Sequence, residues 1–208
     1  VYTRQTAGSI KKKALAADPD YAKAHLNLGI VRMKQGQLDR AMVAFEYALK
    51  ANAAMAEAHH YMGNIYLTAG RYTQAVKAYR DALAVDPYNH RTYYNLGNAY
   101  VSQSLDEKAM DCYRNSARLQ PDYYPAHYNL ASMYQRRGRY AEALKRYSKA
   151  TRLRPRSPAP YRQMAEVYYR MKKYRQALVS AEKARRRNAE ISESFLRDLR
   201  SRVREQRQ

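Results

Sequence analysis

Nearly identical segments recur at an interval of 34 residues, and this interval constrains the fold more than any other feature of the chain. "YYNLGNAY" at Tyr93–Tyr100 has close relatives in "HYMGNIY" at His60–Tyr66 and "HYNLASMY" at His127–Tyr134. Aligned on this interval, the chain holds five gapless repeats, here called repeats 1 to 5, which span residues 22–55, 56–89, 90–123, 124–157 and 158–191. Self-similarity at such a period is typical of architectures in which each unit must stack on its neighbours.

Each repeat is predicted to form two amphipathic helices joined by a turn. Apolar residues recur three and four apart in two stretches of about a dozen residues each. Gly36, Gly70 and Gly138 stand between the two stretches and suit the left-handed turn that ends a first helix. The twentieth place is always alanine, and the twenty-fourth place holds Phe45, Tyr79, Tyr113, Tyr147 and Ala181. The small residues allow the two helices to approach closely, and the aromatic ring fills the space between them.

These repeats resemble the tetratricopeptide repeat family, whose pattern of Leu-Gly, Tyr, Ala, an aromatic residue and Pro appears in most of them. The resemblance covers Ala22 to Ile191. It implies an all-α, right-handed superhelical solenoid of about five helix hairpins, or about twelve helices in all. Two departures stand out: Ser104 and Lys172 replace the turn glycine, and the family's frequent Trp is replaced at the fourth place of every repeat by His25, His59, Tyr93, His127 and Tyr161.

The two ends of the chain are predicted to be half-repeats within a single solenoid spanning residues 1–208. Residues 5–17 fit the second helix of a missing preceding repeat, and residues 192–207 fit a first helix that caps repeat 5. An alternative is that the two lone helices complete each other between subunits, which would give head-to-tail assembly.

The family resemblance also implies a concave groove lined by the first helices, at places 2, 5, 6, 9, 12 and 13 of each repeat. Carboxamides recur there, and each offers a donor and an acceptor to the backbone of an extended peptide. Tyrosines, a histidine and arginines accompany them. The predicted peptide groove comprises Asn27, His60, Tyr61, Asn64, Arg91, Tyr94, Asn95, Asn98, Tyr128, Asn129, Arg136, Arg162 and Gln163.

Some of these carboxamides are alternatively expected to satisfy polar groups of the protein itself. The pairs Asn64/Asn95 and Asn98/Asn129 match the asparagine half of the family's carboxylate clamp. The basic partners of that clamp are absent, because His60, Pro125, Tyr94 and Ala159 occupy their places. A standard carboxylate clamp is therefore not expected, although a looser acidic ligand remains compatible with the groove.

Positive charge is concentrated in the C-terminal third. The chain has 39 Lys and Arg against 18 Asp and Glu, a net charge of +21, and residues 136–208 alone carry 23 basic and 7 acidic side chains. The predicted patch for an anionic partner comprises Lys145, Lys149, Arg152, Lys183, Arg185, Arg186 and Arg187. An acidic protein, nucleic acid or an anionic membrane surface would suit it, and a merely solvated charged face is the alternative.

The sequence contains no pattern that favours catalysis. A glycine-rich phosphate loop, a metal-ligand spacing and a catalytic triad are all missing, so we predict no enzyme activity, no cofactor and no metal site. Cys112 is the single cysteine, and it is expected to be a packing residue. We expect a soluble protein with the cytoplasm favoured, although the first residue is Val1, which leaves a cleaved targeting segment open.

The functional prediction is therefore a non-catalytic scaffold that binds a protein segment or peptide in its groove. Two alternatives stay open: an adaptor that binds nucleic acid or a membrane surface through the basic third, and a structural subunit that assembles through its ends.

Overall fold

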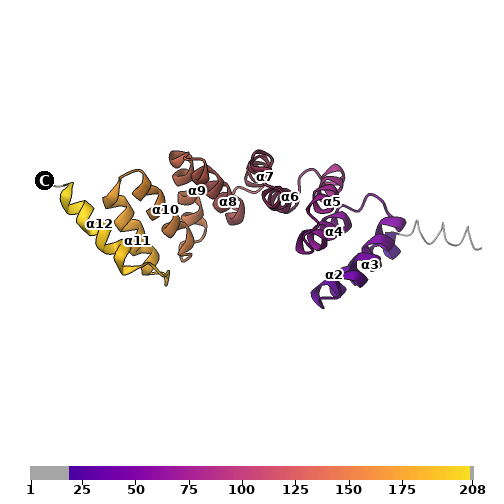
Figure 1. Cartoon of the computed structure of the whole chain (residues 1–208). Helices are drawn as coiled ribbons and strands as arrows, with labels where there is room; N and C mark the ends of the chain where they lie inside the picture. The colour runs from indigo at the N-terminus through magenta and orange to yellow at the C-terminus, as the bar shows by residue number, and fades with distance from the viewer. Residues whose placement is uncertain (1–18, 207–208) are drawn as a thin grey trace, which may run out of the picture. The chain divides into compact units, whose positions relative to one another are not determined.

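A computed structural model describes residues 19–206, and within that range the chain is helical with no strand. The helices are α2 (Pro19–Lys34), α3 (Leu38–Ala51), α4 (Ala56–Thr68), α5 (Tyr72–Val85), α6 (His90–Ser102), α7 (Asp106–Leu119), α8 (Tyr124–Arg136), α9 (Tyr140–Leu153), α10 (Ala159–Arg170), α11 (Tyr174–Arg185) and α12 (Glu193–Glu205) (Figure 1). The predicted all-α repeat fold is confirmed. The helix predicted over residues 5–17 lies outside the described residues.

The chain divides into two compact units, Val1–Cys112 and Tyr113–Gln208, here called the N-terminal and C-terminal units. In the N-terminal unit α2 packs on α3, α3 on α4, α4 on α5 and α5 on α6. In the C-terminal unit α8 packs on α9, α9 on α10, α10 on α11 and α11 on α12. The helices of each of these pairs are therefore neighbours, as expected where each hairpin covers the apolar side of the next.

Within a hairpin, the aromatic ring of the twenty-fourth place lies directly on the glycine of the eighth place. A Cβ atom added to Gly29 would lie 2.4 Å from Phe45 Cε1, and one added to Gly63 would lie 2.5 Å from Tyr79 Cε1. Phe45 and Tyr79 are both fully buried. The ring can occupy that space only because the facing residue has no side chain, so the two places depend on each other.

The turns inside the hairpins adopt the left-handed conformation, including the two that lack glycine. The φ angles are 75° at Gly36, 71° at Gly70 and 70° at Gly138, against 58° at Ser104 and 56° at Lys172. Ser104 closes its turn with a bond of 2.9 Å from its own N–H to the Val101 carbonyl. A residue with a Cβ costs roughly 1 kcal/mol in this conformation, and the flanking helices hold it there.

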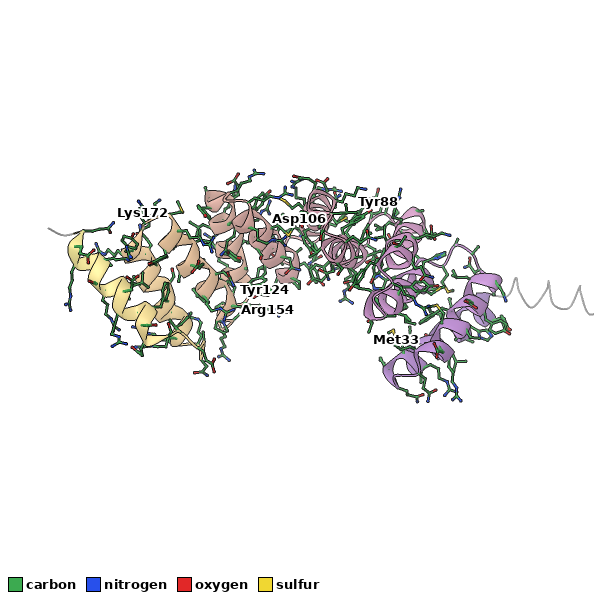
Figure 2. All side chains as sticks on the ribbon, viewed as in Figure 1. Met33, Tyr88, Asp106, Tyr124, Arg154 and Lys172 are labelled. Carbon is green, nitrogen blue, oxygen red and sulfur yellow. The ribbon has the colours of Figure 1, made fainter. Side chains whose placement is uncertain are left out.

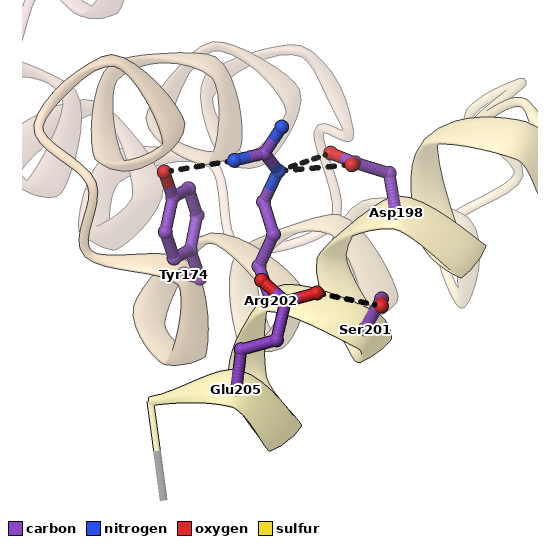
Figure 3. Close-up of polar contacts among 5 residues, drawn as sticks. All are labelled: Tyr174, Asp198, Ser201, Arg202 and Glu205. Carbon is purple, nitrogen blue, oxygen red and sulfur yellow. Dashed lines mark hydrogen bonds and ion pairs between the residues drawn. The ribbon is translucent and has the colours of Figure 1, made fainter. Parts of the chain in front are cut away.

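Helix α12 closes the end of the C-terminal unit. Leu196 and Leu199 are fully buried and pack with Ala165, Ala177 and Ala181 of α10 and α11. Arg202 fastens the helix with bonds of 2.9 Å to the Asp198 carboxylate and 3.2 Å to the Tyr174 hydroxyl (Figure 3). Its exposed positions are polar: Glu193, Ser194, Arg197, Ser201, Arg204 and Glu205. The helix thus covers apolar surface on one side and presents polar groups on the other, while head-to-tail assembly stays a prediction.

Candidate peptide-binding surface

The first helices α4 and α6 of the N-terminal unit bring two of the predicted carboxamides into contact. Asn95 Nδ2 donates a hydrogen bond of 2.8 Å to Asn64 Oδ1, and the same oxygen accepts a bond of 2.7 Å from the Tyr79 hydroxyl. Tyr79 is fully buried, and this burial raises the pKa of its hydroxyl, which therefore remains a donor. These three residues, here called the carboxamide cluster, hold each other in one orientation.

The carboxamide cluster retains hydrogen-bonding capacity for a ligand. Both acceptor sites of Asn64 Oδ1 are used, but within the described residues no partner engages Asn64 Nδ2 or Asn95 Oδ1. Asn64 and Asn95 are half-buried, so their side chains are partly accessible to a ligand. One donor and one acceptor on adjacent side chains match the alternating N–H and C=O groups of an extended backbone.

His60 lies beside the carboxamide cluster as a neutral side chain. Its Nδ1 is 2.8 Å from the Thr92 hydroxyl, and its ring contacts the rings of Tyr61 and Tyr79 at centroid distances of 5.5 and 5.8 Å. Burial, together with the charge of Arg91, lowers the pKa of His60 to about 4. At neutral pH this place in the surface therefore carries no positive charge, unlike the corresponding cation of a carboxylate clamp.

The other predicted groove residues of the N-terminal unit differ in exposure. Tyr61 is half-buried and stacks on Phe45 at a centroid distance of 5.6 Å. Tyr94 and Asn98 are also half-buried, whereas Arg91 is exposed. Asn27 is exposed on α2 and forms no hydrogen bond with the carboxamide cluster.

The C-terminal unit holds a second, looser group on α8 and α10. Asn129 Nδ2 lies 3.4 Å from the Tyr113 hydroxyl, and Tyr128 forms a hydrogen bond with Gln163. Tyr128 also stacks on Tyr124 at 5.9 Å. Figure 2 shows Tyr124 next to Arg154, whose guanidinium lies 4.6 Å from the Tyr124 ring centroid. Arg136 and Arg162 are exposed.

Sequence reasoning missed Tyr79 and Thr92, because both stand at places that pack inside the protein. A signal was nevertheless present in the pairing of the ninth and twenty-fourth places. Repeat 1 has Ile30 with Phe45, whereas repeat 2 has Asn64 with Tyr79. In repeat 4, the Tyr147 hydroxyl likewise donates a hydrogen bond of 2.8 Å to a polar residue of the first helix, Gln135 at the twelfth place. A hydroxyl on the packing ring therefore accompanies a polar partner on the first helix.

The predicted basic patch is distributed over several environments. Lys145, Lys149 and Arg152 line one cavity along α9, while Lys183 lines another beside α11. The other three residues of the patch, Arg185, Arg186 and Arg187, follow Lys183 closely in the sequence. Arg185 pairs with Glu193 at 2.9 Å, Arg187 donates to the Pro155 carbonyl at 2.6 Å, and Arg186 is exposed.

Within residues 19–206 no three His, Cys, Asp or Glu side chains gather as a metal site would require. Burial raises the pKa of the Cys112 thiol to about 12, with a further contribution from Asp111, so this cysteine is a protonated packing residue at neutral pH. In the same range no helix combines the length and apolar character needed to cross a membrane.

Comparisons with known proteins agree with this helical architecture. Family models described as "TPR repeat" match residues 63–104 and 131–172, and models described as "Tetratricopeptide repeat" match residues 32–78, 12–42, 112–145 and 90–123. Together they cover residues 12–172 without a gap. A search of curated proteins found no sequence relative.

Several solved structures share the fold. YrrB, described as a TPR protein with an unusual peptide-binding site, superposes with a TM-score of 0.74 at 20% identity, covering 91% of this chain and 96% of that one. A crystal structure of MamA gives 0.72 at 23% identity, covering 77% and 94%. PilF of Pseudomonas aeruginosa gives 0.72 at 24% identity, covering 83% and 79%. The gapless family matches and the stacked helix hairpins show that the chain belongs to the tetratricopeptide repeat family.

Proposed function

We propose that this chain is a non-catalytic scaffold that binds an extended protein segment across α4 and α6, through the carboxamide cluster. The observation that carries the proposal is the arrangement of Tyr79, Asn64 and Asn95, with bonds of 2.7 and 2.8 Å that converge on one oxygen. Asn64 Nδ2 and Asn95 Oδ1 then face a ligand as an oriented donor and acceptor. A carboxamide that is already oriented loses little rotamer entropy on binding, which favours affinity.

The chemistry at His60, beside the carboxamide cluster, favours an uncharged ligand residue at that place. His60 is neutral at pH 7, and Tyr61 offers a half-buried ring. Tyrosines of this kind supply contact area together with a polar tip. YrrB, which shares the fold, is described as having a peptide-binding site, and this supports the general class of ligand.

The test begins with a phage-displayed random peptide library selected against the purified chain. The best peptide is labelled, and its affinity is measured by fluorescence polarisation for the native chain and for Asn95→Ala. We expect the affinity to fall by about tenfold, because the backbone hydrogen bond to Asn95 Oδ1 is lost and Asn64 loses the partner that orients it.

Asn115→Ala is the matched control, because it removes the same group from α7, a second helix. The affinity of this control should change by less than about twofold. Equal affinities of the native chain and Asn95→Ala, in a variant that remains folded by circular dichroism, would exclude the carboxamide cluster as the binding surface.

A further inference from the structure

A cavity of about 710 Å³ lies in the C-terminal unit, against α9 and the turn that leads from α7 into α8. Four cations from α9 line it: Lys145, Arg146, Lys149 and Arg152. Their spacing along the chain places them on one side of the helix over two turns. Pro121 and His127 form part of the opposing wall. This basic cavity is distinct from the carboxamide cluster, which lies in the N-terminal unit.

Comparison of the repeats shows that this concentration of charge is specific to repeat 4. The four cations stand at the twenty-second, twenty-third, twenty-sixth and twenty-ninth places, where no other repeat has more than two. The twenty-third place is otherwise small and buried, as Ala44, Ala78, Cys112 and Ser180. Arg146 replaces that small residue, so a guanidinium stands where the other repeats pack two helices together.

The orientation of Arg146 is supported by a buried histidine. His127 is 4% exposed, and its Nε2 lies 2.9 Å from the Pro121 carbonyl oxygen, which can only accept. The proton is therefore on Nε2, and Nδ1 is left as an acceptor for Arg146 Nη1 at 3.5 Å. His127 consequently orients Arg146 without adding a charge of its own.

The cations of the basic cavity are only partly neutralised by the protein. Lys149 forms an ion pair of 2.8 Å with Asp122, an exposed carboxylate on the α7–α8 turn. Within residues 19–206 neither Lys145 nor Arg152 has an ion-pair partner. One carboxylate of the protein thus occupies part of the site, and three positive charges remain for a ligand.

We propose that the basic cavity binds an acidic segment of a partner protein, with Glu or Asp carboxylates replacing Asp122 among the cations. Ala117 and Pro121 supply apolar wall for the methylene groups of such side chains. The lining contains no Phe, Tyr or Trp on which a nucleic-acid base could stack, and the ring of His127 is buried. None of the exposed large apolar side chains lies on α9, so this surface has no anchor for a membrane.

The test uses a fluorescein-labelled peptide of alternating Glu and Ala and the same peptide with Gln in place of Glu. We expect the native chain to bind the Glu peptide and not the Gln peptide. Lys145→Gln combined with Arg152→Gln should weaken binding by about tenfold, since each charge-assisted contact contributes several-fold. Arg197→Gln combined with Arg204→Gln changes the net charge equally on the exposed side of α12, and it should change the affinity by less than about twofold.

A gain of affinity provides a second test that misfolding cannot imitate. Asp122→Asn removes the carboxylate that competes for Lys149, so it should tighten binding of the Glu peptide by about threefold. The proposal is overturned if the α9 and α12 double variants lose affinity equally, if the Gln peptide binds as well, or if Asp122→Asn binds no more tightly. Tighter binding of a short single-stranded RNA or of phosphatidylserine vesicles, lost in the α9 variant, would also overturn it.

Discussion

Replacing Asn64 by Ala should destabilise the protein more than replacing its partner Tyr79 by Phe, and the double replacement should be more stable than Asn64→Ala alone. The reason is the position of the Tyr79 hydroxyl, which belongs to a fully buried side chain and donates its bond of 2.7 Å to Asn64 Oδ1. Without Asn64 the hydroxyl is left in the core without a partner. Without the hydroxyl, Asn64 Oδ1 still accepts the bond from Asn95.

The expected magnitudes follow from this asymmetry. Tyr79→Phe removes one hydrogen bond whose other partner stays satisfied, which costs about 1 kcal/mol. Asn64→Ala loses the same bond and also leaves a buried hydroxyl unsatisfied, which adds roughly 1–3 kcal/mol. In the double variant that second penalty disappears. The shared hydrogen bond is also counted in both single variants but is lost only once in the double variant, so the coupling between the two sites should be about 2–4 kcal/mol in favour of the double variant. Repeat 1 already holds an apolar pair of this kind in Ile30 and Phe45.

The assay is urea denaturation followed by circular dichroism for the native chain, both single variants and the double variant. A difference of 1 kcal/mol corresponds to a shift in midpoint of about 0.3–1 M for ordinary denaturant slopes. Additive free energies, or a double variant less stable than Asn64→Ala, would refute the view that the packing ring and the carboxamide depend on each other.

Three further predictions concern the hairpins and pH. Gly63→Ala should lower the free energy of unfolding by about 2 kcal/mol or more, because the added Cβ would lie 2.5 Å from the buried ring of Tyr79. Gly70→Ala is the control in the same urea titration. No atom lies closer than 4.0 Å to the Cβ that it adds, so its effect reports backbone strain alone. Ser104→Gly should raise the free energy of unfolding by roughly 1 kcal/mol in urea titrations, because its φ of 58° suits glycine, and an unchanged midpoint would contradict this strain. The unfolded state protonates His60 near its ordinary pKa of 6.5, whereas the folded state does so only near 4. The free energy of unfolding should therefore fall by up to about 3 kcal/mol between pH 7 and 4, and a matched titration of His60→Gln should lack this part of the fall.

Much of the fold could be predicted from the sequence because it depends on local periodicity. The recurrence of small residues opposite aromatic ones places Gly29 under Phe45, and the structure shows that contact. The turn glycines predict three left-handed turns, whereas it is the structure that shows the same conformation at Ser104 and Lys172, where the sequence departs from the pattern. The turns and packing faces of a repeat can therefore be predicted from the sequence of that repeat, since each follows from spacing along a helix.

The state of each candidate site residue could not be predicted in the same way. Asn64, Asn95 and Asn27 look alike in the sequence, yet the structure bonds the first two to each other and leaves the third exposed on α2. His60 looks like a potential cation until burial beside Thr92 lowers its pKa to about 4. Such differences depend on which atoms from separate helices come within hydrogen-bonding distance.

The amino-acid sequence alone determined that helix hairpins stack at a period of 34 residues, because amphipathic spacing and turn chemistry act within a few residues of each other. Only the tertiary structure decided that Tyr79 orients Asn64 and that His127 orients Arg146. Hydrogen bonds and charge neutralisation act through space over a few ångströms. They are decided only after packing has brought distant parts of the chain together.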